Sequence, residues 1–540
     1  MKRRNILIIA ILTIAICVTA TIFTLHKTTA EPARDKVDAL CFYYLNLDQI
    51  AKKGAFDTHF SAEQRKLIAS ALKTKVEKPE MAQQLESIIT NINNSGIDLT
   101  KPIYCYMDSI ESGYVCVAEV LSDNQIDESL KLLSALYDID INLEEIDGIH
   151  YAKWLNNIAI GYTDDRFIAV VKSKNSDATL AEALTKNLAD LTIFGESDMA
   201  SYINLNKALN AIETSLNEPT NATTTTQCQQ LIADFRTRLT PEANILTTAT
   251  FESGRATIDQ RINGADLSGY NELFHKGENN HLNYLSNNVI AVANLGINGT
   301  TLAELFNEII NNETVRHYAN FGNEMAIYFA VANDVMESIK GDVTIALETL
   351  DGKIVEKIDY YWGGTQLVPS ISDLKASVMV DVADSYIISN IPYFTMGLLR
   401  KVGDNHYNTK LGNYNFTLQQ NESGLLFAGV NTKLEPAITP ATEKMWAAEL
   451  ENSLGYIVVD FDNLTTSTFI ESACNNLLDS EIYTLYNRFT PILSYGYIAI
   501  MEHDHNQLVI SFDNQEENSL KQLSDLILPI VIDEINESLF

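Results

Sequence analysis

The stretch YYLNLDQIAKKG, residues 43–54, starts with the alternation of a β-strand and then loses it. Its first half alternates apolar and polar residues, which puts Leu45 and Leu47 on one face of a strand. Asp48 comes next, and its carboxylate can accept the free backbone N–H groups of a helix that begins at Gln49. The stretch therefore predicts a strand that runs directly into a helix capped by Asp48.

The same order of apolar and Asn or Asp residues recurs along the chain. Near copies are SYINLNKALNAI at 201–212 and YIVVDFDNLTTS at 456–467, and a fainter one is AVAN at 330–333. In each copy the last polar residue takes the place of Asp48 at the predicted helix start. The first positions, 45, 203, 330 and 459, lie 158, 127 and 129 residues apart, which is domain-sized and too long for a solenoid repeat. The spacing predicts four related modules, over residues 31–196, 197–322, 323–451 and 452–540.

Hairpins alternate with single helices inside the first of these modules. The pattern predicts strands at 103–107 and 114–120, which form a hairpin, and then a helix around Ile126. A second predicted hairpin has its turn at Asp164 and Asp165. Hairpins give antiparallel sheets, and each predicted helix has one apolar side to bury. The predicted class is therefore α+β, with mostly antiparallel sheets and helices packed on one face.

The N-terminus carries the strongest targeting signal. Three cations at positions 2–4 precede an uncharged, mostly apolar run over 6–25, and 20 residues at about 1.5 Å each span the roughly 30 Å hydrocarbon core as a helix. A signal peptide cleaved after Ala20 or Ala30 is the alternative. Residues 1–30 are thus a signal anchor, which we favour, or a signal peptide. Both place the rest of the chain on the extracytoplasmic (periplasmic) side of the cell envelope.

Composition limits the partners. The 540 residues include 71 acidic and 38 basic ones, for a formal net charge of −33. Such a charge repels the phosphates of nucleic acids and of anionic lipids, so neither is an expected partner of the folded part. The 46% hydrophobic content is that of an ordinary globular protein.

The cysteines offer one pair of interest. The chain contains no CxxC motif, which argues against zinc knuckles and thioredoxin-type redox motifs. Cys105 and Cys116 flank the predicted hairpin turn and can lie opposite one another. They are either a disulfide or two small buried side chains, and the sequence alone favours the second interpretation.

Two short motifs are candidates for ligand contacts. In MEHDHNQ, residues 501–507, His503 and His505 would lie on one side of an extended strand, where they could hold a metal. A polar turn at the tip of a hairpin explains the same residues, and a two-histidine site still needs a third protein ligand. We therefore favour the turn, and no metal or other cofactor is expected.

The second motif is YYWGG, residues 360–364. Tyr360, Tyr361 and Trp362 could stack on the rings of a sugar if they are exposed. The same residues also suit a packed strand that ends in a Gly-Gly turn, which is the interpretation we favour.

The chain lacks the sequence signatures of common enzymes. It contains no GxSxG, HExxH, GxxxxGK[ST] or GxGxxG motif. We therefore expect a non-enzymatic envelope protein that presents an acidic binding surface to a protein or glycan. The alternative is an extracytoplasmic hydrolase with a site assembled between modules, which requires a pocket where His, acid and Ser or Thr side chains converge.

Two stretches resemble a known family. The run GIDLTKPIYCYM, residues 96–107, together with YYLNLDQIAKKG upstream, is similar to an uncharacterised Bacteroidetes family of extracytoplasmic proteins (DUF4836-like), most clearly over 36–215. The shared motifs are structural, so the resemblance implies an envelope location and no activity. Family members often look like lipoproteins with a small residue before the modified Cys, whereas here Ile16 precedes Cys17, so a lipid anchor is not expected.

Overall fold

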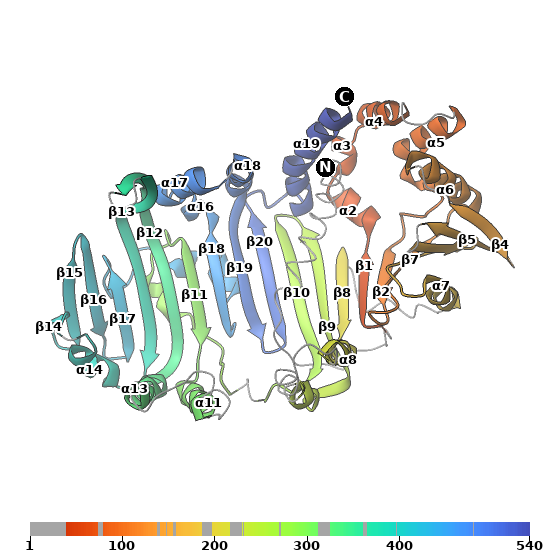
Figure 1. The fold of residues 1–540 in the computed structure, drawn as a ribbon. Helices are drawn as coiled ribbons and strands as arrows, with labels where there is room; N and C mark the ends of the chain where they lie inside the picture. The colour runs from red at the N-terminus through yellow and green to blue at the C-terminus, as the bar shows by residue number, and fades with distance from the viewer. Residues whose placement is uncertain are drawn as a thin grey trace. The chain divides into compact units, whose positions relative to one another are not determined.

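The chain folds into two compact units (Figure 1). Unit 1 comprises Met1–Asp266 with Asn514–Phe540, and unit 2 comprises Leu267–Asp513. The computed structural model describes residues 39–539 apart from 74–78, 138–140, 147, 155–157, 186–196, 217–228, 230–231, 269–271, 312–324, 360–363, 396 and 479.

Unit 1 is built on a sheet whose strands all pair antiparallel. Its order is β4-β5-β6-β7-β3-β2-β1-β8-β9-β10. The strands are β1 (Cys41–Leu45), β2 (Ile103–Met107), β3 (Tyr114–Glu119), β4 (Asn142–Ile146), β5 (Ile149–Trp154), β6 (Ile158–Tyr162), β7 (Arg166–Val171), β8 (Met199–Asn204), β9 (Leu239–Glu252) and β10 (Arg255–Ala265).

Helices cover both faces of this sheet. Leu180 of α7 lies in one core with Phe42 and Val170, whereas Leu130 of α6 lies in another core with Ile160. The expected placement of helices on one face is therefore wrong, because neighbouring residues of β7 point to the two cores. The helices of unit 1 are α2 (Leu47–Lys53), α3 (Phe56–His59), α4 (Ala62–Lys73), α5 (Pro79–Thr90), η1 (Ile92–Ser95), α6 (Asp123–Tyr137), α7 (Ser176–Thr185), α8 (Leu205–Leu216) and α19 (Ser519–Leu539).

The C-terminal helix α19 belongs to unit 1. Asp525 of α19 binds His59 of α3 at 2.7 Å, and Ser519 Oγ donates to the carbonyl of Arg255 at 2.7 Å. The helix continues through Pro529. None of the described helices combines the length and the apolar character that crossing a membrane requires, and the N-terminal run over 6–25 lies outside the described residues.

Unit 2 repeats the strand order of unit 1. Its antiparallel order is β14-β15-β16-β17-β13-β12-β11-β18-β19-β20, in which each strand number is ten higher than in unit 1. The strands are β11 (Ala291–Gly296), β12 (Ile339–Asp359), β13 (Gly364–Val382), β14 (Arg400–Gly403), β15 (His406–Leu411), β16 (Tyr414–Gln420), β17 (Leu425–Val430), β18 (Gly455–Asp460), β19 (Leu493–Glu502) and β20 (His505–Phe512).

The shared order makes the two units a structural duplication. Each unit starts with a strand that leads to helices and a hairpin, continues through a helix into a four-stranded meander, and ends with a second strand, helices and a hairpin. The boundaries of four modules stay a prediction. The helices of unit 2 are η3 (Asn280–Tyr284), α11 (Gly299–Asn311), α13 (Met325–Glu337), α14 (Tyr386–Phe394), η4 (Ala441–Glu443), α15 (Met445–Glu449), α16 (Phe461–Leu464), α17 (Thr468–Leu477), α18 (Ser480–Phe489) and η5 (Thr490–Ile492).

The recurring stretch is the junction at which a strand of each unit becomes a helix. In three junctions the first Asn or Asp of the pair caps the helix, so the predicted caps Asp48, Asn206 and Asp462 are wrong. Each helix begins two residues earlier than expected, which moves those residues into its first turn. In each case the side-chain oxygen of the cap accepts a backbone N–H three residues later. The bonds are Gln49 N–H to Asn46 Oδ1 (3.1 Å), Lys207 N–H to Asn204 Oδ1 (3.0 Å) and Asn463 N–H to Asp460 Oδ1 (3.0 Å).

The fainter copy at 330–333 is not a junction, because it lies inside α13. The remaining junction runs from β11 to α11, where Asn298 Oδ1 accepts the backbone N–H of Thr301 at 3.4 Å. In the other copies the cap follows directly on the alternating residues of the strand. Here Gly296 and Ile297 lie between the alternating residues of β11 and the cap Asn298, so the sequence pattern does not identify this junction. Each unit therefore contains two junctions, on strands that are antiparallel neighbours.

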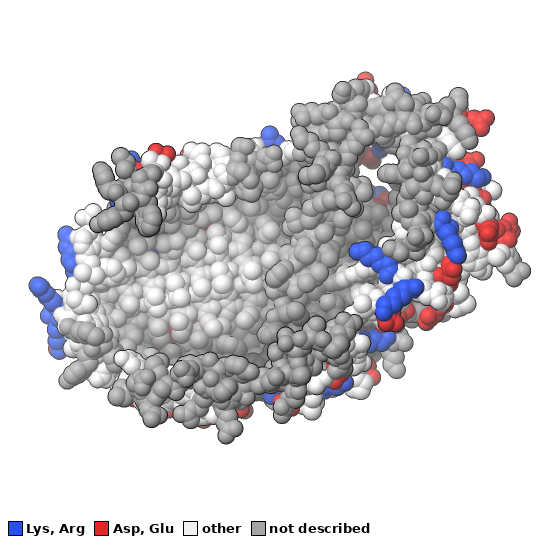
Figure 2. Space-filling view, in the orientation of Figure 1, with Lys and Arg blue, Asp and Glu red and all other residues white. Residues whose placement is uncertain are grey.

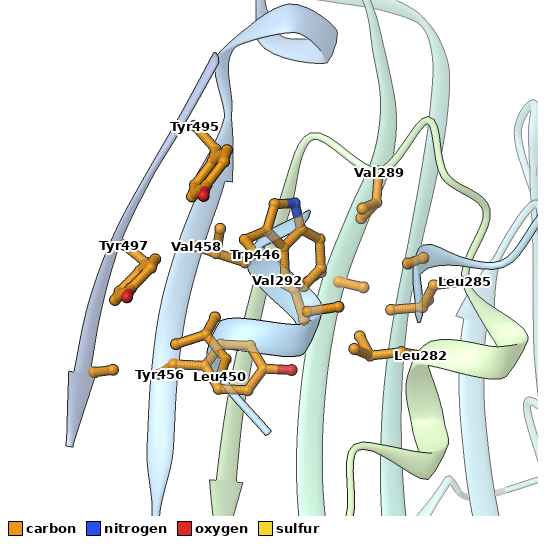
Figure 3. Packing of buried hydrophobic residues seen from close by; sticks show 14 of the residues in the cluster. Leu282, Leu285, Val289, Val292, Trp446, Leu450, Tyr456, Val458, Tyr495 and Tyr497 are labelled. Carbon is orange, nitrogen blue, oxygen red and sulfur yellow. The ribbon is translucent and has the colours of Figure 1, made fainter. Parts of the chain in front are cut away.

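The main core of unit 2 lies on one face of its sheet (Figure 3). Trp446 of α15 is 1% exposed and packs among the side chains of the sheet and of η3. The same corner holds Asp460, whose Oδ2 accepts from Lys444 Nζ at 2.8 Å and from Trp446 Nε1 at 3.5 Å. Burying a carboxylate requires such partners, so the cap of α16 also ties α15 to β18.

Candidate functional site

The two histidines of the MEHDHNQ motif lie at a tight hairpin turn. Glu502, the last residue of β19, pairs with His505, the first residue of β20, and His503 lies in the turn. Burial lowers the pKa of His503, with Lys276 adding to the effect and Asp504 and Glu502 opposing it. Among the residues that the structure describes, no three His, Cys, Asp or Glu side chains gather closely enough to hold a metal ion.

The aromatic motif YYWGG cannot be placed. Tyr360, Tyr361 and Trp362 lie outside the described residues, between the ends of β12 and β13. Their contact with a glycan stays a prediction.

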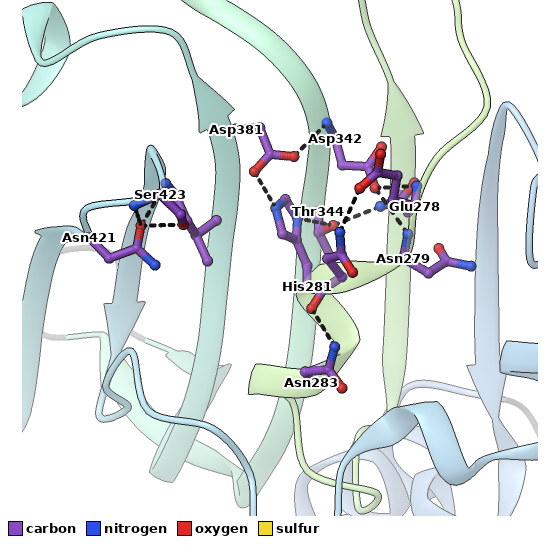
Figure 4. A network of polar contacts seen from close by, with 12 residues as sticks. Glu278, Asn279, His281, Asn283, Asp342, Thr344, Asp381, Asn421 and Ser423 are labelled. Carbon is purple, nitrogen blue, oxygen red and sulfur yellow. Dashed lines mark hydrogen bonds and ion pairs between the residues drawn. The ribbon is translucent and has the colours of Figure 1, made fainter.

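A histidine, an aspartate and a threonine do converge in unit 2 (Figure 4). His281 Nδ1 lies 2.7 Å from Thr344 Oγ1, and His281 Nε2 lies 3.2 Å from Asp381 Oδ1. This is the set of groups that the hydrolase alternative requires. None of the three was singled out in the sequence, because they come from η3, β12 and β13 and share no local motif.

Burial removes the threonine hydroxyl and the histidine of this set from any substrate, whereas Asp381 is partly exposed. Thr344 is 0% exposed, and Asn294 Nδ2 already donates to its hydroxyl oxygen at 2.8 Å. The same hydroxyl lies within hydrogen-bond distance of His281 Nδ1, so the groups around it are buried groups of the protein. A nucleophile needs an accessible oxygen, which this network does not offer.

The network instead fixes the loop that precedes η3. Asp342 Oδ2 accepts the backbone N–H groups of Glu278 at 3.1 Å and of Asn279 at 3.2 Å. Burial alone would raise the pKa of Asp381, but its hydrogen bond and charge interaction with His281 outweigh burial and lower it. The backbone N–H of Asp342 and the charge of Lys340 act in the same direction. The arrangement is a buried structural network.

Among the described residues, the other face of the unit 2 sheet is apolar and exposed along its middle strands. Three isoleucines on it, Ile345, Ile457 and Ile498, are 56%, 59% and 48% exposed. Figure 2 shows a broad field of uncharged side chains over the middle of this sheet. A contiguous apolar surface of this kind is typical of a binding site. The residues directly opposite one another across its strands are Ile498, Ile457, Ala293, Ile345, Val378, Ala428 and Leu418.

A cavity of about 470 Å³ lies at one end of this row. Val378, Ala428 and Leu418 line it from the sheet, and Leu398 and Leu399 line it from the segment after α14. Its volume falls within the range of about 300–1,000 Å³ that is usual for small-molecule sites. The cavity is therefore large enough for a ligand.

The lining of the cavity is almost entirely apolar. The hydroxyl of Thr395 is one of its few polar groups, and it already donates to the carbonyl of Ile391 at 2.8 Å. A ligand in the cavity thus finds hydrocarbon surfaces and very few groups that could form hydrogen bonds.

The course of the chain after α14 keeps the cavity open. The helix packs on the sheet through Ile388 and Ile391, contains Pro392 and ends at Phe394. Gly397 then takes a left-handed conformation (φ 76°), and its N–H donates to the carbonyl of Pro392 at 3.0 Å. The chain turns at this point and leaves Leu398 67% exposed beside the cavity.

The sequence contains a signal for this face that the alternation rule overlooks. In KASVMVDV, Val378 and Val380 face the open side, while Met379 between them is buried in the core. A continuous apolar run in an antiparallel strand indicates that side chains on both faces of the sheet make apolar contacts. One face is covered by the core. On the other face Val380 packs under α14, whereas Val378 beside the cavity is 38% exposed.

The geometry defines an α+β protein of two duplicated antiparallel units, one of which has an open apolar face with a cavity. The sequence comparison gives the family. Residues 36–362 match the family described as "Domain of unknown function (DUF4836)", and the chain belongs to this family. The resemblance to DUF4836 inferred from the two sequence stretches is thereby confirmed, whereas an origin in Bacteroidetes stays a prediction.

Other comparisons add little. No curated protein matches the sequence. Among solved structures, TP0453 in crystal form III is similar over 44% of this chain and 83% of its own, at 12% identity and a TM-score of 0.22. TP0453 in crystal form I is similar over 44% of this chain and 81% of its own, at 12% identity and a TM-score of 0.23.

Proposed function

We propose that the protein is a non-enzymatic binding protein of the cell envelope, and that the cavity of unit 2 takes an acyl chain of a lipid. The observation that carries this proposal is the cavity of about 470 Å³ with an almost wholly apolar lining. Each buried CH₂ group of an alkyl chain gains about 0.8 kcal/mol, which suits a lining of leucine, valine and phenylalanine.

The chemistry of the cavity argues against the glycan ligand that the acid-rich sequence suggested. A sugar ring would bring several hydroxyl groups against hydrocarbon surfaces, and each buried hydroxyl without a partner costs about 1–3 kcal/mol. An acyl chain carries no such groups, and its polar end can stay in water because the sheet face beside the cavity is open.

The location in this proposal comes from the N-terminus. The cations at positions 2–4 and the apolar run over 6–25 support export and anchoring in the membrane, with both units on the periplasmic side. A membrane-anchored protein meets lipids there, so an acyl ligand would be available to it.

Titration of the purified protein with a fluorescent fatty acid tests this function. We expect saturable binding of one molecule per chain and displacement by palmitate. Val378→Asn should weaken binding at least tenfold, because it places an amide in the cavity. Ile498→Asn is the matched control, since Ile498 lies in the same open row outside the cavity lining. Absence of binding, or equal losses in both variants, would contradict the proposal.

A further inference from the structure

Two cysteines of unit 1 face each other across a hairpin. Cys105 of β2 and Cys116 of β3 are direct partners in the antiparallel pair, and their sulfur atoms lie 2.9 Å apart. Directly opposed residues have Cα atoms about 4.5–5.5 Å apart, and a disulfide needs about 4.4–6.8 Å. The two strands can therefore accept a bond between these sulfurs without changing their register.

The surroundings make one of the sulfurs a nucleophile. The hydrogen bond from the Cys105 thiol lowers the pKa of Cys116, although burial opposes this effect. The same hydrogen bond, with burial, raises the pKa of Cys105. When the pair loses one proton, the other stays on Cys105 and the negative charge lies on Cys116, and the thiolate is the form that attacks a disulfide.

The pair can also be reached. Cys105 and Cys116 are half-buried, and Tyr114, two residues before Cys116 on the same face of β3, is exposed. Cys41 on the neighbouring strand β1 differs, because it is buried and burial raises its pKa. The structure therefore distinguishes one reactive pair from a third cysteine nearby.

We propose that Cys105 and Cys116 form a disulfide bond when the protein meets a disulfide oxidant. The Cys116 thiolate attacks one sulfur of the oxidant, breaks its S–S bond and releases one thiolate. Cys105 then loses its proton, attacks Cys116 Sγ and releases the second thiolate of the oxidant. Two electrons pass to the oxidant, and the two protons of the cysteine pair end on the two thiols that it becomes.

The bond would fasten β2 to β3 beside the first junction strand. In an envelope location the hairpin would then be locked, because extracytoplasmic compartments keep disulfides oxidised. The inference stands apart from the acyl-chain site, which lies in unit 2.

The test uses reduced, purified full-length protein treated with oxidised glutathione and then with N-ethylmaleimide. No Lys or Arg lies between Cys105 and Cys116, so trypsin leaves both in one peptide. We expect that peptide to carry no maleimide and to weigh two hydrogens less. Cys474, a half-buried cysteine of unit 2, serves as the control. Once any bound glutathione is removed by reduction, its thiol should react with maleimide. Maleimide or glutathione on both Cys105 and Cys116 would overturn the proposal.

A variant tests the order of the two steps. Cys105→Ser removes the resolving thiol, so Cys116 should retain glutathione as a mixed disulfide. An unmodified Cys116 in this variant would overturn the assignment of Cys116 as the attacking sulfur. The oxidised wild-type protein should also unfold at a Tm roughly 5–10 °C higher than the reduced protein, judged by the signal of unit 1.

Discussion

The two units share one topology but differ in the helix that follows their third strand. In unit 1 this helix is α6, which has 15 residues and buries Ile126 and Leu130 against β5, β6 and β7. In unit 2 it is α14, which has nine residues and includes Pro392. The longer helix completes a core, whereas the shorter one leaves the apolar cavity beside it.

This difference shows how a duplicated scaffold can acquire a site. The sheet supplies apolar rows in both units, because residues on one face of neighbouring strands directly oppose each other. The side chains that lie over the row then decide between a packed core and a cavity. A change in one connecting helix is enough, and the strand order does not have to change.

The largest expected effect contrasts the covered and the open face of unit 2. Trp446→Ala removes the largest side chain of the core and should lower the free energy of unfolding of unit 2 by about 3–5 kcal/mol. Ile457→Ala, on the open face of β18, should cost less than about 1 kcal/mol. Hydrogen exchange of the β11 and β18 amides in increasing urea measures both. Equal losses would mean that the apolar face is covered in solution.

The second prediction contrasts the two helices directly. Leu130→Ala in α6 should destabilise unit 1 by about 2–5 kcal/mol, because Leu130 is buried in a packed core. Leu398→Ala, beside the cavity of unit 2, should change stability by less than about 1 kcal/mol. The same urea series compares them. A large loss for Leu398→Ala would show that the segment after α14 closes over the cavity.

The sequence predicts the local elements well where the pattern is short-range. The junction strands at 45, 203 and 459, the hairpin of β2 and β3 and the opposition of Cys105 to Cys116 are all in place. Gly96 ends its helical segment in the left-handed conformation (φ 92°), as a glycine at that position should. These features depend on neighbours within a few residues, which the sequence shows directly.

The site could not be predicted in the same way. The cavity combines residues of β12, β13, β15, β16 and β17 with the segment after α14, and their registers are set by the whole sheet. The polar network likewise joins residues about 60–100 positions apart. Alternation alone could not show that Val378 is exposed while Met379 is buried, because the two residues are equally apolar.

The third prediction adds volume at corresponding places in the two units. Ala169 of β7 and Ala428 of β17 both oppose the third strand of their unit. Ala169→Leu should destabilise unit 1 by about 1–3 kcal/mol, because that core is already filled by α6. Ala428→Leu should leave unit 2 within about 1 kcal/mol of wild type and abolish fatty-acid binding. Thermal unfolding and the fluorescence titration measure these changes. If Ala428→Leu destabilised unit 2, the cavity would not have room for a larger side chain at this position.

The smallest effect concerns one histidine–aspartate pair in each unit, His281 with Asp381 and His59 with Asp525. The pKa of Asp381 is lowered in unit 2 because its interactions with His281 and other partners outweigh burial. The pKa of Asp525 is lowered in unit 1 because its interactions with Lys521 and His59 outweigh burial. A lowered pKa stabilises the folded state above the unfolded value near 4, and this contribution disappears as the pH falls through the folded value. Because Asp381 is 35% exposed, Asp381→Asn should cost at most about 1 kcal/mol at pH 7 and nothing at pH 2.

Asp525→Asn provides the comparison, since Asp525 pairs with both His59 and Lys521 at a site that is more exposed to water. The histidine side chain is 16% exposed there and 2% exposed in the pair of His281 with Asp381. Solvent screens the more exposed pair, so the loss at pH 7 should be smaller in unit 1 than in unit 2. Urea unfolding at pH 7, 4 and 2, followed for each unit by hydrogen exchange, measures both variants. If the loss of unfolding free energy instead grew toward low pH, the folded state would favour the protonated aspartate. The pKa of that aspartate would then be raised, which would contradict this prediction.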